Sequence, residues 1–267
     1  MTFNDTDIEA AARLLIEHRD HQTPHPVVSI RFAPPDLATA YRIQSAFETI
    51  LVQERGDRAI GYKIGATNQV ARTHLKIQAP FFGRLYHSIT SASPAHLPNA
   101  PGFFRAHEPE IALQIDRDLP PTQAPYTAEQ IAAATRAVLP VIEVVGSCFT
   151  PWAEAGAPNL AADNAAHGYW VTGTPTTNFA GLDLLSITVS LSVNGTVVAT
   201  GEGRNVDGGP FGAAAWLANT LAAMGRGLKA GDFISTGTVM PPYPTGAAQD
   251  VVADFGPLGR VALRIGD

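Results

Sequence analysis

The sequence predicts an α+β fold, in which clusters of strands form the core and a few helices lie outside them. Two observations support this prediction. Strand-like segments occur in clusters, and the residues after 231 contain only strand-like and loop-like segments. There is no internal repeat of about 20–50 residues and no phosphate-binding glycine loop. Clustered strands with few helices are typical of the α+β class.

The N-terminal part of the chain is predicted to be helical. Residues 5–19 carry apolar residues at helical spacing, and Asp5 or Thr6 can cap this helix. Residues 20–35 contain four prolines and are expected to form a loop. A second helix is expected over residues 36–54, and the two helices together would form a small cap.

The middle of the chain is expected to combine strands with short helices. One strand carries a lysine and ends at a glycine, and an asparagine can cap the helix that follows. The expected elements are a strand at 58–67, a helix at 68–75, a turn and strand at 79–86, a surface loop at 88–103, a strand at 107–115, a helix from 127 to about 138, and strands at 139–146 and 169–172.

The C-terminal part is expected to hold a hairpin, one long helix and three further strands. Apolar and polar residues alternate from Leu184, and Asn194-Gly195 has the sequence of a type I′ hairpin turn. The other expected elements are a helix at 212–225, strands at 232–238, 251–255 and 260–265, and a Pro/Gly-rich loop over 240–248.

The composition excludes several classes of function. The net charge is −6 and the isoelectric point is near 5.7, whereas nucleic-acid binding requires a basic face. No apolar run approaches the ~18 residues of a membrane span, and the first residues lack the basic start of a signal peptide. Cys148 is the only cysteine, so no internal disulfide is possible. We therefore expect a cytoplasmic protein with one structural thiol and no nucleic-acid or membrane partner.

Three carboxylates stand in strand-like surroundings. Glu108 and Glu110 are two residues apart in a strand, so both point to one face with their Cα atoms about 7 Å apart, and like charges there repel. Glu143 lies among β-branched residues, where an unpaired carboxylate is costly to bury. One divalent cation would resolve both problems, and an all-carboxylate set favours Mg²⁺ or Mn²⁺. In the alternative interpretation, the first two acids lie at a solvated strand edge and the third pairs with an arginine.

Three further polar residues are candidates for roles in a site. Lys63 lies between Tyr62 and Ile64, and partial desolvation would lower its pKa and make it an acid/base or anion-binding group. Alternatively, it extends into solvent from a strand edge. Asp163 either supports the site or forms a structural turn, and His167 is more typical of a structural histidine than of a metal ligand.

Several motifs together resemble the 2-oxopent-4-enoate hydratase / 4-oxalocrotonate decarboxylase family of the fumarylacetoacetate hydrolase superfamily. The match spans most of the chain, and the combination is specific although each motif alone is weak. The motifs are Gly61-Tyr-Lys-Ile-Gly65, Pro80-Phe-Phe-Gly83, Glu108-Pro-Glu-Ile-Ala112, Arg117-Asp-Leu-Pro120, Val141-Ile-Glu-Val-Val-Gly-Ser147, Ala162-Asp-Asn-Ala165, Ala215-Trp-Leu-Ala218 and Ser235-Thr-Gly-Thr238.

The resemblance implies a mixed β-sandwich roll with peripheral helices. Residues 1–57 would be an N-terminal helical segment, and residues 58–267 the metal-binding catalytic domain. The site residues that it implies are Glu108, Glu110 and Glu143 as ligands of Mg²⁺ or Mn²⁺, Lys63 as the catalytic acid/base, and Thr236, Gly237 and Thr238 near the substrate. Phe81, Phe82 and Asp163 are further candidate substrate contacts, with ordinary core packing as the alternative for the two aromatic residues.

The implied activity is hydration of a short-chain 2-oxo or 2-hydroxydienoic acid in aromatic-compound or related catabolism, through a metal-stabilised enolate. The same stabilisation serves 4-oxalocrotonate-type decarboxylation and acylpyruvate-type C–C hydrolysis, which remain alternatives. A non-enzymatic alternative is an assembly partner in a decarboxylase/hydratase complex, and we expect a homo-oligomer. Family vinylpyruvate hydratases often carry Asp where this chain has Phe81, and commonly Asn where it has Gly212. We therefore expect a preference for a longer or substituted substrate over 2-hydroxypenta-2,4-dienoate.

Overall fold

The computed structural model describes residues 3–23, 25–26, 33–100 and 102–266. The α-helices in these ranges are α1 (Asp5–His21), α2 (Leu37–Thr49), α3 (Gln69–Leu75), α4 (Ala128–Ala133), α5 (Gly156–Ala162) and α6 (Gly209–Ala223), and a π-helical segment, Ile50–Glu54, continues α2. The strands are β1 (His25–Pro26), β2 (Ala59–Gly65), β3 (Phe81–Tyr86), β4 (Thr90–Ala92), β5 (Ala95–Leu97), β6 (Phe104–Ile115), β7 (Thr135–Gly146), β8 (Phe149–Thr150), β9 (His167–Thr172), β10 (Thr188–Val193), β11 (Thr196–Glu202), β12 (Phe233–Thr238), β13 (Tyr243–Pro244), β14 (Asp250–Asp254) and β15 (Arg260–Ile265).

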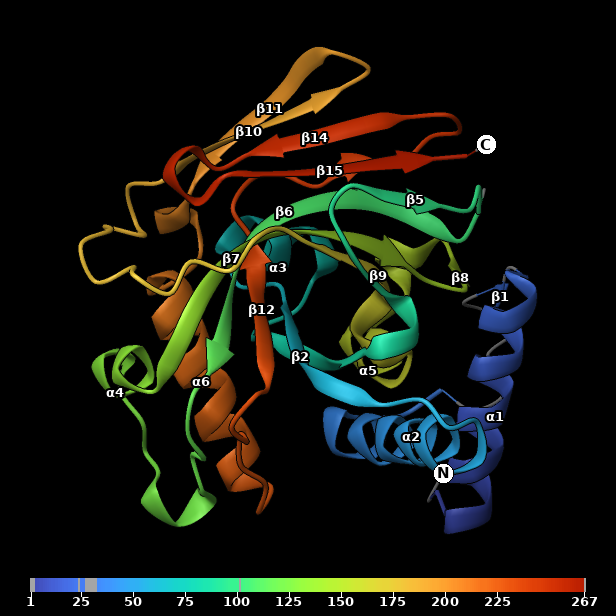
Figure 1. Cartoon of the computed structure of the whole chain (residues 1–267). Coiled ribbons are helices and arrows are strands. Elements are labelled where there is room, and N and C mark those ends of the chain that lie inside the picture. The colour runs from blue at the N-terminus through green and yellow to red at the C-terminus, as the bar shows by residue number, and fades with distance from the viewer. Residues whose placement is uncertain (1–2, 24, 27–32, 101, 267) are drawn as a thin grey trace.

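The larger sheet curls into a roll. Its strand order is β3-β2-β12-β6-β7-β9-β4, and β13 pairs with β6 beside this path. The sheet is mixed, because β12 runs parallel to β2 and antiparallel to β6. A second sheet, in the order β11-β10-β14-β15-β5, lies over one side of the roll (Figure 1). The predicted α+β class and the mixed β-roll are confirmed.

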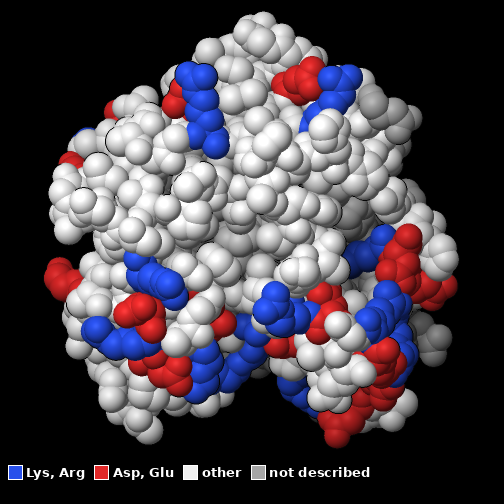
Figure 2. Space-filling view, in the orientation of Figure 1, with Lys and Arg blue, Asp and Glu red and all other residues white. Residues whose placement is uncertain are grey.

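The helices lie outside the sheets, at two separate places. Figure 1 shows α6 alongside β12, and α1 and α2 together on the other side of the roll near β2. Helix α2 also packs against α5, which leads into β9. No helix within the described ranges is long and apolar enough to cross a membrane. On the face shown in Figure 2, acidic and basic side chains are interspersed and no basic patch is visible.

The helix caps follow the local sequence. Asn4 caps α1, with its side chain accepting from the Asp7 amide, so the predicted caps Asp5 and Thr6 are one and two residues too late. Asp36 caps α2 and Asn68 caps α3, each by accepting a backbone amide three residues on. The predicted hairpin turn is confirmed, because Asn194 and Gly195 have φ values of 50° and 79°.

The predicted helix from residue 127 to about 138 is too long. Thr127 caps α4 as its sequence indicates, but this helix ends at Ala133. The residues from Thr135 onward belong to β7, where Val138 lies opposite Leu113 of β6. Pairing along the whole length of β6 therefore outweighs the helical spacing of a few apolar residues.

Two stretches that were expected to be loops contain short strands. Residues 88–103 hold β4 and β5, which run parallel to β9 and β15. Residues 240–248 hold β13, which pairs with β6. Separately, helix α6 begins at Gly209, three residues before its predicted start. Within the predicted loop 20–35, α1 continues to His21 and β1 pairs with β8, whereas residues 24 and 27–32 lie outside the described residues.

Apolar side chains fill the interior of the roll on the face that carries the acidic residues. This inner cluster consists of Leu85, Ala112, Leu139, Val141 and Trp170. Because side chains alternate along β6 and β7, Ala112 and Val141 share their face with the predicted metal ligands. The acidic side chains therefore point into the interior of the roll, beside the apolar side chains of this inner cluster.

Candidate active site

The three predicted metal ligands meet at the pairing of β6 with β7. Glu108 lies directly opposite Glu143, and Glu110 lies two residues further along β6. One carboxylate oxygen from each of these residues lies within 4.8 Å of the other two. Glu110 and Glu143 are fully buried, whereas Glu108 is partly exposed. The alternative of a solvated strand edge does not describe this arrangement.

The electrostatics of the cluster fit a divalent cation. Burial, followed by repulsion from Glu143, raises the pKa of Glu108 to about 7. Burial and both neighbouring acids raise the pKa of Glu110 well above its ordinary value. Glu110 Oε1 and Glu143 Oε2 are buried without a hydrogen-bond partner among the described residues. Buried carboxylates with free oxygens are the donor set that a hard divalent ion satisfies, so these three residues form a candidate divalent-metal site.

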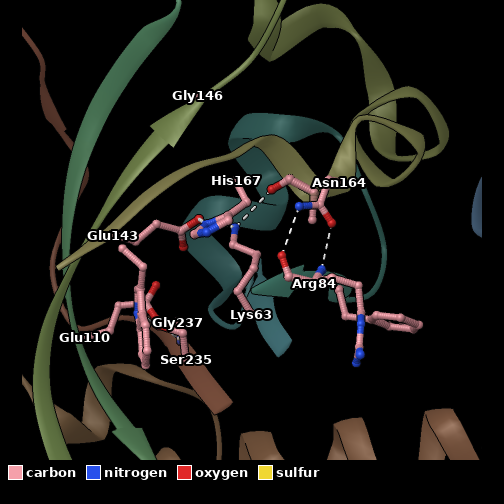
Figure 3. Close-up of polar contacts among 12 residues, drawn as sticks. Lys63, Arg84, Glu110, Glu143, Gly146, Asn164, His167, Ser235 and Gly237 are labelled. Atoms are coloured by element: carbon pink, nitrogen blue, oxygen red, sulfur yellow. Dashed lines mark hydrogen bonds and ion pairs between the residues drawn. The ribbon is translucent and has the colours of Figure 1, made fainter. Parts of the chain in front are cut away.

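Lys63 reaches the cluster from β2. Its Nζ lies 3.2 Å from Glu143 Oε1 and donates to the Ala165 carbonyl oxygen at 3.0 Å (Figure 3). The side chain is buried, so the alternative of a lysine that extends into solvent is wrong. The predicted lowering of its pKa is also wrong in direction. Burial acts to lower the pKa of Lys63, but the charges of the three nearby glutamates, Glu143 foremost, raise it.

His167 orients one of the carboxylates. It begins β9, is fully buried, and places Nδ1 2.9 Å from Glu143 Oε1. The Lys63 ammonium and this imidazole offset the burial of Glu143 and lower the pKa of that carboxyl. Burial lowers the pKa of His167, so the neutral ring donates from Nδ1 to the carboxylate. His167 thus contacts a candidate metal ligand, which is a closer relation to the site than that of the purely structural histidine that the sequence favours.

Ser235, which the sequence analysis did not single out, contacts one of the candidate metal ligands. Its hydroxyl donates to Glu110 Oε2 at 2.6 Å and accepts from Trp170 Nε1 at 3.0 Å. The Gly237 amide donates to the same carboxylate oxygen at 3.0 Å. The signal was present, since period-two alternation in β12 places residues 235 and 237 on one face.

The remaining predicted substrate contacts differ in their positions. The Gly237 amide donates to a Glu110 carboxylate oxygen. Thr238 lies directly opposite Glu110 in the pairing of β12 with β6. Phe81 begins β3 opposite Gly65, at the end of the strand that carries Lys63.

Three other candidates are engaged within the protein. Phe82 stacks on Tyr41 of α2, with ring centroids 4.3 Å apart, on the face of the sheet away from Lys63. Thr236 donates its hydroxyl to the Ile111 carbonyl. Asp163 accepts hydrogen bonds from an arginine of α1 and from a serine after β7.

Comparisons with known proteins find a family model and relatives whose descriptions agree with one another. The sequence model described as fumarylacetoacetate (FAA) hydrolase C-terminal matches residues 52–266. The chain is 33% identical over 261 residues to a 2-keto-4-pentenoate hydratase from Paraburkholderia phymatum, covering 97% of each chain. It is 38% identical over 200 residues to a 2-hydroxyhexa-2,4-dienoate hydratase from Comamonas testosteroni, covering 74% of each chain.

Two solved structures share the fold. One is a 4-oxalocrotonate decarboxylase from Pseudomonas putida G7, complexed with magnesium and adipate; its TM-score is 0.91, with 24% identity over 99% of both chains. The other is a fumarylpyruvate hydrolase from Pseudomonas aeruginosa in complex with Mn²⁺ and pyruvate. Its TM-score is 0.61, with 14% identity, covering 78% of this chain and 89% of the other.

Proposed function

The chain belongs to the fumarylacetoacetate hydrolase family, and we propose that it is a divalent-metal-dependent hydro-lyase acting on a short-chain 2-oxo or 2-hydroxydienoic acid. The observation that carries this proposal is the cluster of Glu108, Glu110 and Glu143, with the Lys63 ammonium 3.2 Å from one carboxylate oxygen. Relatives at about one-third identity over nearly the whole chain are named hydratases, which supports hydration as the reaction. An assembly partner without activity would have no use for buried acids with free oxygens.

The three carboxylates would hold Mg²⁺ or Mn²⁺, which an all-oxygen donor set favours. When bound, such an ion supplies Lewis-acid stabilisation of the negative charge that develops on the 2-oxygen of the substrate. Ser235 and the Gly237 amide fix Glu110, and His167 fixes Glu143, so the ligand oxygens are oriented before substrate binds.

Lys63 would move the proton. Its ammonium is held by Glu143 and by the Ala165 carbonyl, and its side chain is buried inside the roll. From there we propose that the ammonium donates a proton to C3 of the 2-hydroxydienoic acid during tautomerisation. The amine so formed accepts the proton released from the 2-hydroxyl group, which restores the ammonium, and the reverse steps exchange the proton at C3 of the 2-oxo acid. Gly237, Thr238 and Phe81 would flank the substrate, because they lie beside Glu110 and at the end of β2.

Three of the predicted contacts would act indirectly. Phe82, Thr236 and Asp163 use their rings or polar atoms within the protein, so we propose that they support the site. The same proton transfer serves decarboxylation of a 4-oxalocrotonate-type acid, and the shared fold with a decarboxylase makes this the second candidate. We also propose a cytoplasmic homo-oligomer in which residues 1–57 and 58–267 form the two parts of each subunit.

The test is metal-dependent turnover of a panel of 2-oxo and 2-hydroxydienoic acids. Water addition, CO₂ release and pyruvate release are followed in parallel, with and without Mg²⁺ or Mn²⁺ after exhaustive chelation. We expect hydration to dominate and to vanish in the chelated protein. Full turnover after chelation would refute the metal-dependent assignment, and faster CO₂ release than hydration would favour the second candidate.

A further inference from the structure

The chain makes an unusual backbone turn next to Lys63. Asn164, Ala165 and Ala166 have φ values of 49°, 54° and 55°, so three consecutive residues other than glycine are left-handed. Residues with a Cβ adopt this conformation at an energetic cost, and they do so singly far more often than in succession. A turn of this kind persists only where its surroundings hold it, and such turns cluster at functional sites.

This turn supplies a contact to each of two groups in the site. The Ala165 carbonyl accepts from Lys63 Nζ at 3.0 Å, as Figure 3 shows. His167 follows directly and places Nδ1 against Glu143. A change in the turn would therefore displace both the ammonium and the imidazole that contact one metal ligand.

Arg19 of α1 fastens the turn at both ends. Its Nε lies 2.5 Å from Asp163 Oδ1, and its terminal nitrogens donate to the carbonyls of Asp163 and His167, each at 2.7 Å. A weaker bond reaches the Gly146 carbonyl at the end of β7, at 3.3 Å. The Arg19 side chain is only 11% exposed. Its guanidinium group thus binds the main-chain carbonyl oxygens of the residues immediately before and after the three left-handed residues.

The opposite side of the turn is anchored to β3. The Asn164 side chain accepts from the Arg84 amide at 2.7 Å and donates to the Arg84 carbonyl at 2.9 Å (Figure 3). Gly83 allows this approach, because a Cβ at that position would lie 2.4 Å from the Asn164 carbonyl oxygen. Gly83 is also the partner of Lys63 in the β2–β3 ladder. The turn is therefore clamped between α1 and the strand beside the lysine.

We propose that Arg19 is a positioning residue for Lys63, acting through the left-handed turn 164–166. Its effect on catalysis rests on the proposed role of Lys63, but its effect on the Lys63 side chain does not. A buried ion pair with Asp163 alone would be weak evidence for any role beyond packing. Arg19 also donates to main-chain carbonyls on both sides of the turn. These bonds connect α1 to the backbone of the turn, whereas an ion pair alone would connect it only to the Asp163 carboxylate.

The experiment compares Arg19→Met with Arg19→Lys and with the control Arg13→Met. Arg13 lies on the same helix, and its ion pairs with Glu9 and Glu54 are exposed, so it reports on α1 without touching the turn. The chain's lysines are Lys63, Lys76 and Lys229, so isotope-labelled lysine gives a simple spectrum of side-chain ammonium groups. Assignment uses Lys63→Met. Binding of Mg²⁺ and of oxalate is measured by calorimetry, and kcat and KM are measured on the best substrate.

We expect the Lys63 ammonium signal to shift or broaden in Arg19→Met while Mg²⁺ binding is retained. A displacement of the acid/base group by about 1 Å costs up to about 100-fold, so kcat should fall by that order with little change in KM. Arg19→Lys keeps the charge but not the planar fork, so an intermediate loss is expected even if Arg19→Met does not fold. Arg13→Met should match the unmodified protein.

An unchanged Lys63 signal in both Arg19 variants would overturn the proposal, as would an unchanged kcat. Loss of Mg²⁺ binding in parallel with kcat in both Arg19 variants would also overturn it, because that pattern indicates a general structural role. If the unmodified protein turns over no 2-oxo acid, the proposed function fails, and the ammonium spectrum still decides whether Arg19 positions Lys63.

Discussion

Glu108 gives the protein a stability that depends on pH and on metal in a calculable way. Burial and Glu143 raise the pKa of Glu108 from its ordinary value of 4.5 to about 7. In the metal-free protein the folded state therefore binds more protons than the unfolded state between these two pH values. Stability then falls as pH rises through this window. For Glu108 alone, a rise in pKa from 4.5 to about 7, at 1.36 kcal/mol per pH unit, corresponds to a loss of about 3 kcal/mol across this window, and the raised pKa of Glu110 acts in the same direction.

A divalent cation should reverse the sign of this dependence. Below pH 7 the ion competes with a proton on Glu108, so stabilisation by Mg²⁺ should be small at pH 5 and larger at pH 7.5. The assay is urea unfolding of the chelated protein and of the protein with saturating Mg²⁺ across this range. The controls are Glu108→Gln and, at an exposed acidic position, Glu154→Gln.

The two controls make the argument refutable. Glu108→Gln should flatten the pH dependence of the chelated protein by about 3 kcal/mol and remove most of the Mg²⁺ effect, whereas Glu154→Gln should change neither. If the chelated protein and Glu108→Gln lose the same stability between pH 5 and 7.5, the assigned pKa and the reasoning from it are wrong.

Three further predictions concern the same site. Glu143→Gln should lose most Mg²⁺ affinity and nearly all turnover while the fold survives, which calorimetry and circular dichroism check; turnover close to that of the unmodified protein would contradict the ligand set. Lys63→Ala should still bind oxalate with Mg²⁺ but lose solvent deuterium exchange at C3 of a 2-oxo acid, and exchange at an unchanged rate would reject its role in proton transfer. Because Phe81 makes its part of the site apolar, kcat/KM should favour a longer or substituted acid over 2-hydroxypenta-2,4-dienoate by about 1–3 kcal/mol; fastest hydration of the five-carbon acid would count against this inference.

The position of the acidic cluster was predictable because it depends on local rules. Alternation along one strand places Glu108 and Glu110 on one face, and the apolar frame of Glu143 marks a buried acid that needs a partner. The register that sets Glu108 opposite Glu143 cannot be read from either strand alone, although the shared face of Glu108 and Glu110 was predicted. Within strands, therefore, the placement of these side chains could be predicted from the residues themselves.

The supporting contacts could not be predicted, because they join segments that are distant in sequence. Arg19 and Asp163 are 144 residues apart, and no periodicity in α1 distinguishes Arg19 from Arg13. The direction of the Lys63 pKa was missed for the same reason. Its apolar neighbours along the strand indicate desolvation, whereas the three glutamates that reverse the effect come from other strands.

The strand order of the roll also affects when the site can form. The carboxylate strands β6 and β7 are complete by Gly146, but β2 joins them through β12, which ends at Thr238. A chain emerging from the ribosome can therefore pair its acidic strands early. The strand that carries the ammonium reaches its final neighbour only after nearly nine-tenths of the sequence has been made. During that interval the three acids lack the ammonium that offsets the burial of Glu143 in the finished fold, so their mutual repulsion opposes the pairing of β6 with β7.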